Sequence, residues 1–406
     1  MPKDAETTVT PLSNEADWPV HGHEVRPWKS SVRGPKEDRM LTEVTVSLPP
    51  HILTLDLPLP GDVLAAVERA TVAIATLDAM YGDRLATFGS FLIRSEAVSS
   101  SRIERENASI DDIAKATIGL KSPSAARTTV AAARAVQHMV TDASSGTITL
   151  DAVLAAHHTL MHDDPHDGIY AGKVRTVQNW IGGSDYSPRG AVHVPPPPDT
   201  VEEYLADLIG FANRDDLPAL VQAALVHAQF ESIHPFADGN GRIGRALINA
   251  VLRRRGVTRR LVVPIASALV AHVDAYFGSV NAYRDGHAGQ FVAHLAAAAG
   301  LAADGAAASA DYLASLPIQW HDTVGARKGS TTDRIIDVLL EYPALDVHTV
   351  TNRLKVSDQA AWDALNRLTE AGVLHELTRS KRDRAWAATE VMNELDGLNN
   401  RLRGIA

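Results

Sequence analysis

The sequence predicts a mostly α-helical protein with more than one domain, and three observations support this. Apolar residues recur at helical spacing along much of the 406-residue chain. Alanine is abundant and only 5% of residues are aromatic, which favours closely packed helices. The hydrophobic content of 45% is sufficient for two or more cores. Because the chain has no cysteine, disulfides and thiolate metal sites are excluded.

The residue pattern divides the chain into five parts. They are an N-terminal arm (1–44), an N-terminal helical region (45–125), a helical core (126–300), a helix or linker (301–330) and a C-terminal domain (331–406). In the arm, Trp18 and Trp28 are expected to order a polar, extended segment. A loose alternation over residues 40–48 predicts a short strand, and Gly61 begins an amphipathic helix.

The core is predicted to contain several further helices. They are expected over residues 128–139, 151–161, 200–211 and 267–284, and from residue 289 onward. Thr200 and Glu203 form a capping-box pattern at the start of the third of these helices. Near the end of the second helix lie four histidines, His157, His158, His162 and His166. They lack the H-E-x-x-H spacing, so we expect surface or capping histidines and no metal site.

Residues 234–245, with the sequence HPFADGNGRIGR, carry the chemistry of this chain. Apolar residues at helical spacing lie on both sides, which predicts a tight loop and a second helix beginning near Gly241. A helix N-terminus with glycines ahead of it presents unpaired backbone N–H groups that attract anions. Arg242 and Arg245 are three residues apart, so both can face one ligand. The loop is therefore predicted to bind phosphate.

Each polar residue of this loop suits one task. His234 can accept a hydroxyl proton near neutral pH. Asp238 is a hard oxygen ligand for Mg²⁺ bridging phosphates. The phosphate cradle is expected from Gly239, Asn240, Gly241, Arg242 and Arg245.

The loop resembles the signature of the Fic (filamentation induced by cAMP) family, H-x-F-x-[D/E]-G-N-G-R-x-x-R, with every fixed position filled. No Walker sequence G-x-x-x-x-G-K-[ST] is present. The alternative is an ordinary helix–loop–helix connection in which His234 caps a helix and the arginines are solvated. The resemblance covers about residues 57–299 and implies a Fic-type helical core.

The resemblance also implies an activity. Fic proteins transfer AMP from ATP, with Mg²⁺, to a Ser, Thr or Tyr hydroxyl of a target protein and release pyrophosphate. Doc, a kinase of the same superfamily, has lysine at the position of Gly241. Glycine there favours nucleotidyl transfer. We therefore expect a protein adenylyltransferase.

A second resemblance lies in residues 95–104, which alone predict a polar helix with Glu104 on its surface. In Fic proteins an inhibitory helix carries [S/T]-x-x-x-E-[G/N], and Ser100 with Glu104 fits the first five positions. The sixth is Arg105, where the family has Gly or Asn. By resemblance Glu104 pairs with Arg245 and blocks the place of the γ-phosphate. Its position ahead of the core implies a class II Fic protein.

Residues 175–184 and 191–196 predict a β-hairpin, with prolines placing one strand at an edge. By resemblance this hairpin is the flap that holds a target segment by strand addition. The alternative is a plain surface hairpin. The residues assigned to target docking are Gly182, Gly183, Ser184, Ala191, Val192, His193 and Val194.

The C-terminal part begins after linker-like segments at 302–311 and 325–330. Three helices, marked by the apolar residues of 335–340, 347–354 and 358–371, precede two strands over 373–377 and 385–388. This order resembles a winged helix-turn-helix domain. The predicted wing is basic (Arg379, Lys381, Arg382 and Arg384), whereas the recognition helix carries Asp358 and Asp363, which repel phosphate. DNA binding and a protein-contacting role therefore both stay open.

Charge and hydropathy exclude other classes. The net charge of −10 argues against whole-chain nucleic-acid binding. The start lacks an apolar signal core, and residues 294–310 are interrupted by Gly300, Asp304 and Gly305, so we expect a cytoplasmic protein without a membrane span. A transcriptional regulator or antitoxin-like protein that senses nucleotide is the alternative function. Self-modification and a homodimer are further open partners.

Overall fold

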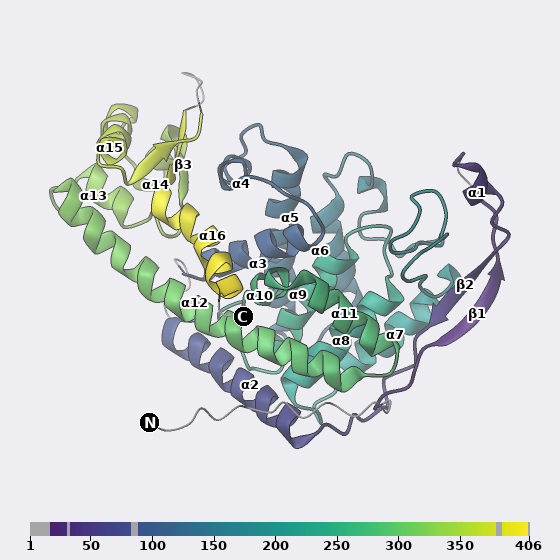
Figure 1. Cartoon of the computed structure of the whole chain (residues 1–406). Helices are drawn as coiled ribbons and strands as arrows, with labels where there is room; N and C mark the ends of the chain where they lie inside the picture. Colours follow the sequence, from purple (N-terminus) through teal and green to yellow (C-terminus); the bar gives the residue numbers. More distant parts are fainter. Residues whose placement is uncertain (1–16, 31–32, 83–87, 379–383, 405–406) are drawn as a thin grey trace, which may run out of the picture.

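The computed structural model describes residues 17–30, 33–82, 88–378 and 384–404. Figure 1 shows a mostly helical molecule in which the long helix α12 runs from the core to the C-terminal elements. Helices of the central part are α2 (Gly61–Tyr81), α3 (Ser90–Ile103), α4 (Ile110–Thr117), α5 (Ser124–Ala143), α6 (Leu150–Met161), α7 (Val201–Ala212), α8 (Ala219–Ile233), α9 (Asn240–Arg254), α10 (Ile265–Ala271), α11 (Val273–Arg284) and α12 (Ala288–Val324). The predicted mostly helical class is confirmed.

Two helices, α8 and α9, occupy the centre of the core. From Leu220 to Ile233 every residue of α8 is buried, and so is every residue of α9 from Asn240 to Leu252. A helix buried on all sides must be surrounded by other elements. Helix α9 packs on α8, α5 and α3, and α8 on α7 and α12. The loop 234–239, which joins them, is thereby fixed at both ends by the best-packed part of the molecule.

The N-terminal part contains an antiparallel ribbon. Strand β1 (Gly22–Pro27) pairs with β2 (Glu43–Leu48) in the register Gly22↔Leu48 to Pro27↔Glu43, with the short helix α1 (Lys36–Arg39) between them. The strand predicted over 40–48 is thus present, and β1 lies within the segment expected to be an arm. Trp18 is buried and lies beside Tyr283 of α11.

Helix α12 corrects the expectation of a linker at 302–311, because it continues without a break for 37 residues. One of its glycines, Gly305, serves close packing. A Cβ at Gly305 would lie 2.9 Å from Leu398 Cδ1, so glycine allows α16 (Thr389–Gly404) to approach. By length and composition α12 could cross a membrane, but 56% of its most apolar window is buried inside the protein.

Two other local predictions in the core are wrong. The helix expected over 267–284 is interrupted at His272 (φ −133°, ψ 55°), which separates α10 from α11. The capping box at Thr200 does not form, because a 3₁₀ turn, η4 (Pro198–Thr200), precedes α7. The Thr200 hydroxyl donates instead to the carbonyl of Pro197 (2.9 Å).

The C-terminal elements are α13 (Thr331–Ile336), β3 (Ala344–Asp346), α14 (Val347–Leu354), α15 (Asp358–Glu370), β4 (Leu374–Glu376), β5 (Ala385–Ala388) and α16. The three predicted helices and two strands are present. Strand β3 was not predicted, and it completes an antiparallel sheet in the order β3-β5-β4. Helix α16, also not predicted, returns to pack on α10, α12 and α3 (Figure 1).

The predicted basic wing is described only in part, since residues 379–383 lie outside the described ranges. Arg384 is described. It pairs with Glu376 and its guanidinium lies over the rings of Trp362 (4.7 Å) and Trp386 (5.1 Å). Arg384 is therefore engaged within its own domain.

Candidate functional site

The loop between α8 and α9 is built on two residues with left-handed backbone. His234 ends α8 at φ 47°, and Gly239 precedes α9 at φ 79°. A non-glycine residue at positive φ is uncommon and stores strain, whereas glycine adopts it freely. The strained residue is the proposed base.

Asn240 closes this loop from inside. Its Oδ1 accepts a hydrogen bond from the Phe236 amide (2.8 Å), and its Nδ2 donates to the Phe236 carbonyl (2.9 Å). The side chain predicted to bind nucleotide is therefore buried and used by the loop itself. Its contribution to an anion site is the shape of the backbone.

His157 supports the loop from α6, and its prediction as a surface or capping residue is wrong. It is 1% exposed, and its ring stacks on Phe236 with centroids 3.7 Å apart. Its Nδ1 accepts from the Gly172 amide (2.9 Å), so Nε2 carries the proton and donates to the Asp238 carbonyl (3.0 Å). Burial lowers the pKa of His157 to about 4, so the ring is neutral.

The other three histidines of that group are exposed, as predicted: His158, His162 and His166. Within the described ranges, no three His, Asp or Glu side chains gather closely enough to hold a metal ion unaided. A metal site here would need oxygens from a ligand.

His234 is held by two residues that the sequence analysis did not single out, Arg175 and Asn179. Arg175 Nε donates to the His234 carbonyl (2.9 Å), and Asn179 Nδ2 lies 3.0 Å from His234 Nδ1. Burial, Arg175 and Arg284 together lower the pKa of His234 to about 3. The imidazole is consequently neutral at neutral pH, which is the form that accepts a proton.

The predicted flap hairpin is reduced to a single antiparallel bridge between Ile181 and His193. Ile181 donates to the His193 carbonyl (2.8 Å), and Val192 donates to the Ile181 carbonyl (2.8 Å). Gly182 and Gly183 have positive φ, and their turn ends the pairing. A strand pattern alone does not reveal that glycines and flanking prolines will prevent a longer ladder.

Several residues assigned to the flap are used within the protein. His193 is buried beside the Ser232 carbonyl (Nε2 to O, 2.9 Å), and the Val194 carbonyl accepts from the Ser47 amide (2.8 Å). Val194 packs against Val44 and Val46 of β2. Val192, in contrast, is 66% exposed. The N-terminal ribbon thus covers one side of the segment and leaves Val192 open.

Asp238 and Arg242 form the outer part of the anion site. Asp238 is largely exposed, and its Oδ2 accepts from Arg242 Nη2 (3.0 Å). Arg242 is only 5% exposed, and its Nε and Nη1 have no hydrogen-bond partner among the described residues. Buried donors without acceptors are costly, so an anionic ligand would relieve this arrangement.

Arg245 forms the inner part, and the structure brings it together with Ser100 and Glu104 as predicted. Nε donates to Ser100 Oγ (2.8 Å), and Nη2 donates to the Ser100 carbonyl (3.0 Å) and to Glu104 Oε1 (2.7 Å). Burial alone would lower the pKa of Arg245, but Glu104, Tyr276 and Glu231 raise it above its usual value. Arg245 is therefore a permanent cation whose Nε and Nη2 are both occupied by Ser100 and Glu104.

The Glu104 carboxylate also lies at the N-terminus of α9. A Cβ built on Gly241 would be 1.9 Å from Glu104 Oε1, so only glycine permits this approach. The first turn of a helix is where unpaired N–H groups and the helix dipole favour an anion. Glu104 therefore fills the cradle that the sequence assigns to phosphate.

Arg105, which departs from the family pattern, caps the C-terminus of α3. Helix α3 ends in a Schellman arrangement, with Glu106 N–H donating to the Ser101 carbonyl and Arg105 N–H to the Arg102 carbonyl (both 3.0 Å). This cap needs a left-handed residue, and Arg105 has φ 62°. Gly or Asn would fit with less strain, but arginine still leaves Glu104 in contact with Arg245.

Helix α3 is anchored from the C-terminal side by α16. Arg102 Nη2 donates to Asp396 Oδ1 (2.7 Å), and the Ser99 hydroxyl donates to Asn399 Oδ1 (2.9 Å). The helix that carries Glu104 is thus held by the last helix of the chain.

Comparison with known proteins places part of this chain beside a known family. Residues 147–252 match the model of the Fic/DOC family. The "Protein adenylyltransferase fic-1" of Caenorhabditis briggsae is 29% identical over 152 residues, which are 37% of this chain and 27% of that protein. The "Protein adenylyltransferase Fic" of Nematostella vectensis is 35% identical over 116 residues, 28% of this chain and 24% of that protein. The chain thus matches about a quarter of the length of these relatives.

One solved structure supports the fold. The crystal structure of a Fic family protein from Desulfovibrio desulfuricans G20 superposes with a TM-score of 0.54 and 21% identity. It covers 81% of this chain and 97% of that chain. The likeness therefore extends beyond the residues that match the family model.

Proposed function

We propose, from the premise that residues 147–252 form a Fic domain, that this protein is an adenylyltransferase that transfers AMP from ATP to a hydroxyl of a target protein. The observation that carries the proposal is the filled cradle at α9, where the Glu104 carboxylate lies against Gly241 and binds Arg245. A carboxylate held in this way marks a site built for anionic oxygens.

The reaction needs one proton acceptor. The target oxygen attacks the α-phosphorus, a new P–O bond forms, the bond to the β-phosphate oxygen breaks, and pyrophosphate leaves. The hydroxyl proton passes to the neutral imidazole of His234, which Arg175 and Asn179 hold in place. A positioned base of this kind contributes roughly 10²–10⁴-fold in rate.

The leaving pyrophosphate needs positive charge. The unpartnered Nε and Nη1 of Arg242, the α9 N-terminus and, once freed, Arg245 supply it. The exposed carboxylate of Asp238 suits Mg²⁺, which characteristically takes one or two protein carboxylates and completes its shell with phosphates and water. Bound there, the metal would neutralise charge on the phosphates.

We propose that Glu104 inhibits this reaction. The Arg245 Nη2 that binds the Glu104 carboxylate cannot at the same time serve a γ-phosphate, and Nε and Nη2 also donate to Ser100. ATP binding therefore requires that Glu104 move away. The exposed Val192 is the proposed contact for the target segment.

For the C-terminal elements we propose a winged helix-turn-helix that contacts protein. Support comes from the order of α13, β3, α14, α15, β4 and β5. Exposed Asp358 and Asp363 on α15 disfavour phosphate, and Arg384 is engaged with Glu376.

The proposal is tested with ATP labelled at either phosphorus. The full chain carrying Glu104→Gly is incubated with Mg²⁺ and α-³²P-ATP or γ-³²P-ATP, with Glu104→Gly/His234→Ala as the matched control. We expect protein labelling from the α-position only, and none in the control. Labelling from the γ-position would identify a kinase, and no labelling from either would contradict transferase activity.

A further inference from the structure

A cavity of about 360 Å³ lies between α3, α4 and α5, on the part of α3 that precedes Ser100. Its wall is mostly apolar, formed by Ile93, Ala97 and Val98 of α3, Ile113 of α4 and Val130 of α5. Cavities of this size and character are typical of small-molecule sites. Nothing in the proposed transfer reaction uses it.

The first polar group of the cavity is Arg94 of α3. Its Nε and Nη2 are buried and have no hydrogen-bond partner in the described part of the chain. Among the described residues, no carboxylate is found to offset the charge, and burial lowers the pKa of Arg94 to about 10. Two buried donors without acceptors on a guanidinium that remains charged at neutral pH are costly, so their position indicates a missing anion.

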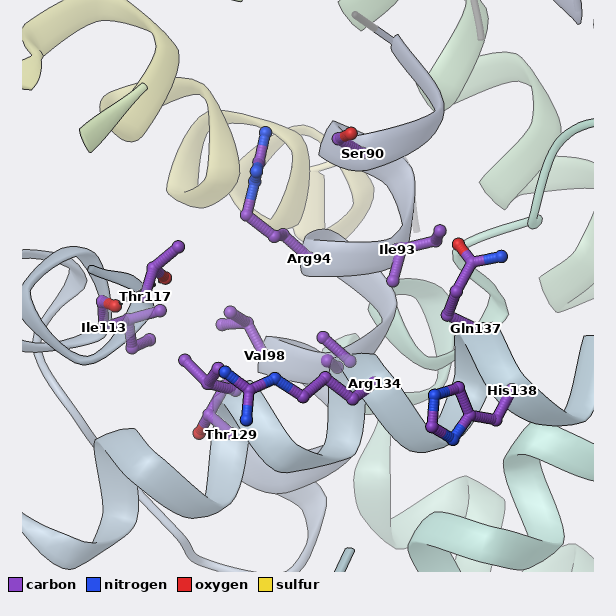
Figure 2. Close-up of a pocket in the computed structure, with 13 residues that line it drawn as sticks. Ser90, Ile93, Arg94, Val98, Ile113, Thr117, Thr129, Arg134, Gln137 and His138 are labelled. Carbon is purple, nitrogen blue, oxygen red and sulfur yellow. Dashed lines mark hydrogen bonds between the residues drawn. The ribbon is translucent and has the colours of Figure 1, made fainter. Parts of the chain in front are cut away.

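The second polar group is Arg134 of α5. It is exposed and lines the same cavity. Figure 2 shows the guanidiniums of Arg94 and Arg134 on opposite sides of the hollow, with Val98 between them. Two cations therefore flank an apolar floor, an arrangement complementary to a molecule with an apolar body and an anionic head group.

We propose that this cavity binds a small amphipathic anion, with its apolar body on Ile93, Val98 and Ile113 and its carboxylate or phosphate head group at Arg94. Arg134 adds charge at the rim. The volume of about 360 Å³ suits a single small molecule, and the unsatisfied donors of Arg94 favour a negative charge on it.

The cavity lies on the same helix as the inhibitory segment, so a bound ligand would affect that segment. Arg94 and Glu104 lie ten residues apart on one helix and its cap, about 15 Å along the axis. The cavity is present while Glu104 holds Arg245, so an occupant that bridges α3 to α5 stabilises the arrangement described here. The binding itself does not depend on the proposed transferase activity.

The test is calorimetric titration of the full-length protein, without ATP, using octanoate and octyl phosphate as probes. Octanol and inorganic phosphate are the control titrants, one lacking the charge and the other the apolar chain. We expect both probes to bind at one site and to raise the melting temperature, and the control titrants to bind at least tenfold more weakly. If octanol bound as tightly as octanoate, Arg94 would not bind the charged head group, and the proposal would be wrong. Absence of binding by both probes would also overturn it.

Variants locate the site. Arg94→Gln and Arg134→Gln should each weaken probe binding, Arg94→Gln by tenfold or more, whereas Arg69→Gln, on an exposed face of α2 outside the cavity, should leave it unchanged. Ala133→Leu fills the cavity and should weaken the octyl probes. If Arg94→Gln does not fold, the site is tested with Arg134→Gln, at an exposed position, and with Ala133→Leu. Unchanged binding in both of these would refute the assignment.

Discussion

Arg242 and Arg245 lie one turn apart on α9, yet the two ends of the anion site that they define are in opposite states. Within the described part of the chain, Arg242 has one carboxylate partner, the exposed Asp238, and two buried donors without acceptors. Arg245, in contrast, donates from Nε and Nη2 to Ser100 and Glu104. The Arg242 end can offer these two donors to an anionic ligand, whereas at the Arg245 end the Glu104 carboxylate occupies the place of such a ligand.

Under the proposed function, this difference makes the inhibition local. The loop 234–239 is fixed at both ends, because α8 is buried from Leu220 to Ile233 and α9 from Asn240 to Leu252. Admission of a triphosphate would then require movement of the tip of α3. The proposed function therefore implies an assembled site closed by one ion pair, and each end of the site can be tested.

The largest effect is expected at the base. In the Glu104→Gly background, His234→Ala should lower labelling from α-³²P-ATP by about 10²–10⁴-fold, because the proton acceptor is lost. ATP affinity measured by calorimetry should stay the same, since the ring acts on the hydroxyl. A matching loss of affinity would contradict this separation of the base from the phosphate site.

The same residue sets the pH dependence. The neutral ring is the active form, and a pKa near 3 keeps it neutral throughout the range from pH 8 to pH 6. Labelling should fall through protonation of His234 only in strong acid. A decline centred near pH 6.5 would show a solvated histidine instead.

The open end of the site is tested by Asp238→Ala in the Glu104→Gly background. Loss of the carboxylate should weaken binding of MgATP by about tenfold or more, as expected for one charged interaction. Calorimetry with and without Mg²⁺ measures this. If the variant bound ATP equally well and with the same Mg²⁺ dependence, Asp238 would serve only to hold Arg242.

The closed end depends on how firmly α3 is anchored. Asp396→Ala removes the ion pair from α16 to Arg102, a partly exposed pair, and pairs open to solvent contribute about 0.2–1 kcal/mol. Labelling by the otherwise native chain should rise by a few-fold at most. Asp56→Ala removes a surface pair with Arg214 away from α3 and is the control. Equal effects of the two variants would exclude a specific role for α16.

The smallest effect is expected at Arg105. Arg105→Gly relieves a left-handed arginine and should raise the free energy of unfolding by about 1 kcal/mol, measured by urea denaturation. Glu106→Gly, at a neighbouring position without positive φ, should not stabilise the protein. A loss of stability in Arg105→Gly would show that the arginine side chain, rather than its backbone, matters at this cap.

The sequence was sufficient for the parts of the site whose chemistry is local. The loop from His234 to Arg245 could be predicted because glycines, polar groups and helix ends follow each other within a dozen residues. The pairing of Glu104 with Arg245 rested on resemblance, because 141 residues separate them. Arg175, Asn179 and His157 could not be found, since they act through contacts with carbonyl groups and a neighbouring ring.

Elements defined by hydrophobic periodicity were predicted correctly, whereas elements defined by packing against distant parts of the chain were missed. Gly300 and Gly305 suggested a break in α12, but the helix continues through both, and Gly305 permits the close approach of α16. The flap had a strand pattern, yet the turn at Gly182 and Gly183 left one bridge. Helix α16 was missed because it packs on helices far away in the sequence, among them α10, α12 and α3.

The most direct test of the account is a comparison of self-labelling by the native chain and by Glu104→Gly under identical ATP and Mg²⁺. Freeing Arg245 should let the phosphates align with the incoming hydroxyl, and misalignment of this kind can cost about 10²-fold in rate. We expect self-labelling to rise by about that factor in the variant. Equal or lower labelling would show that Glu104 is not the inhibitory group.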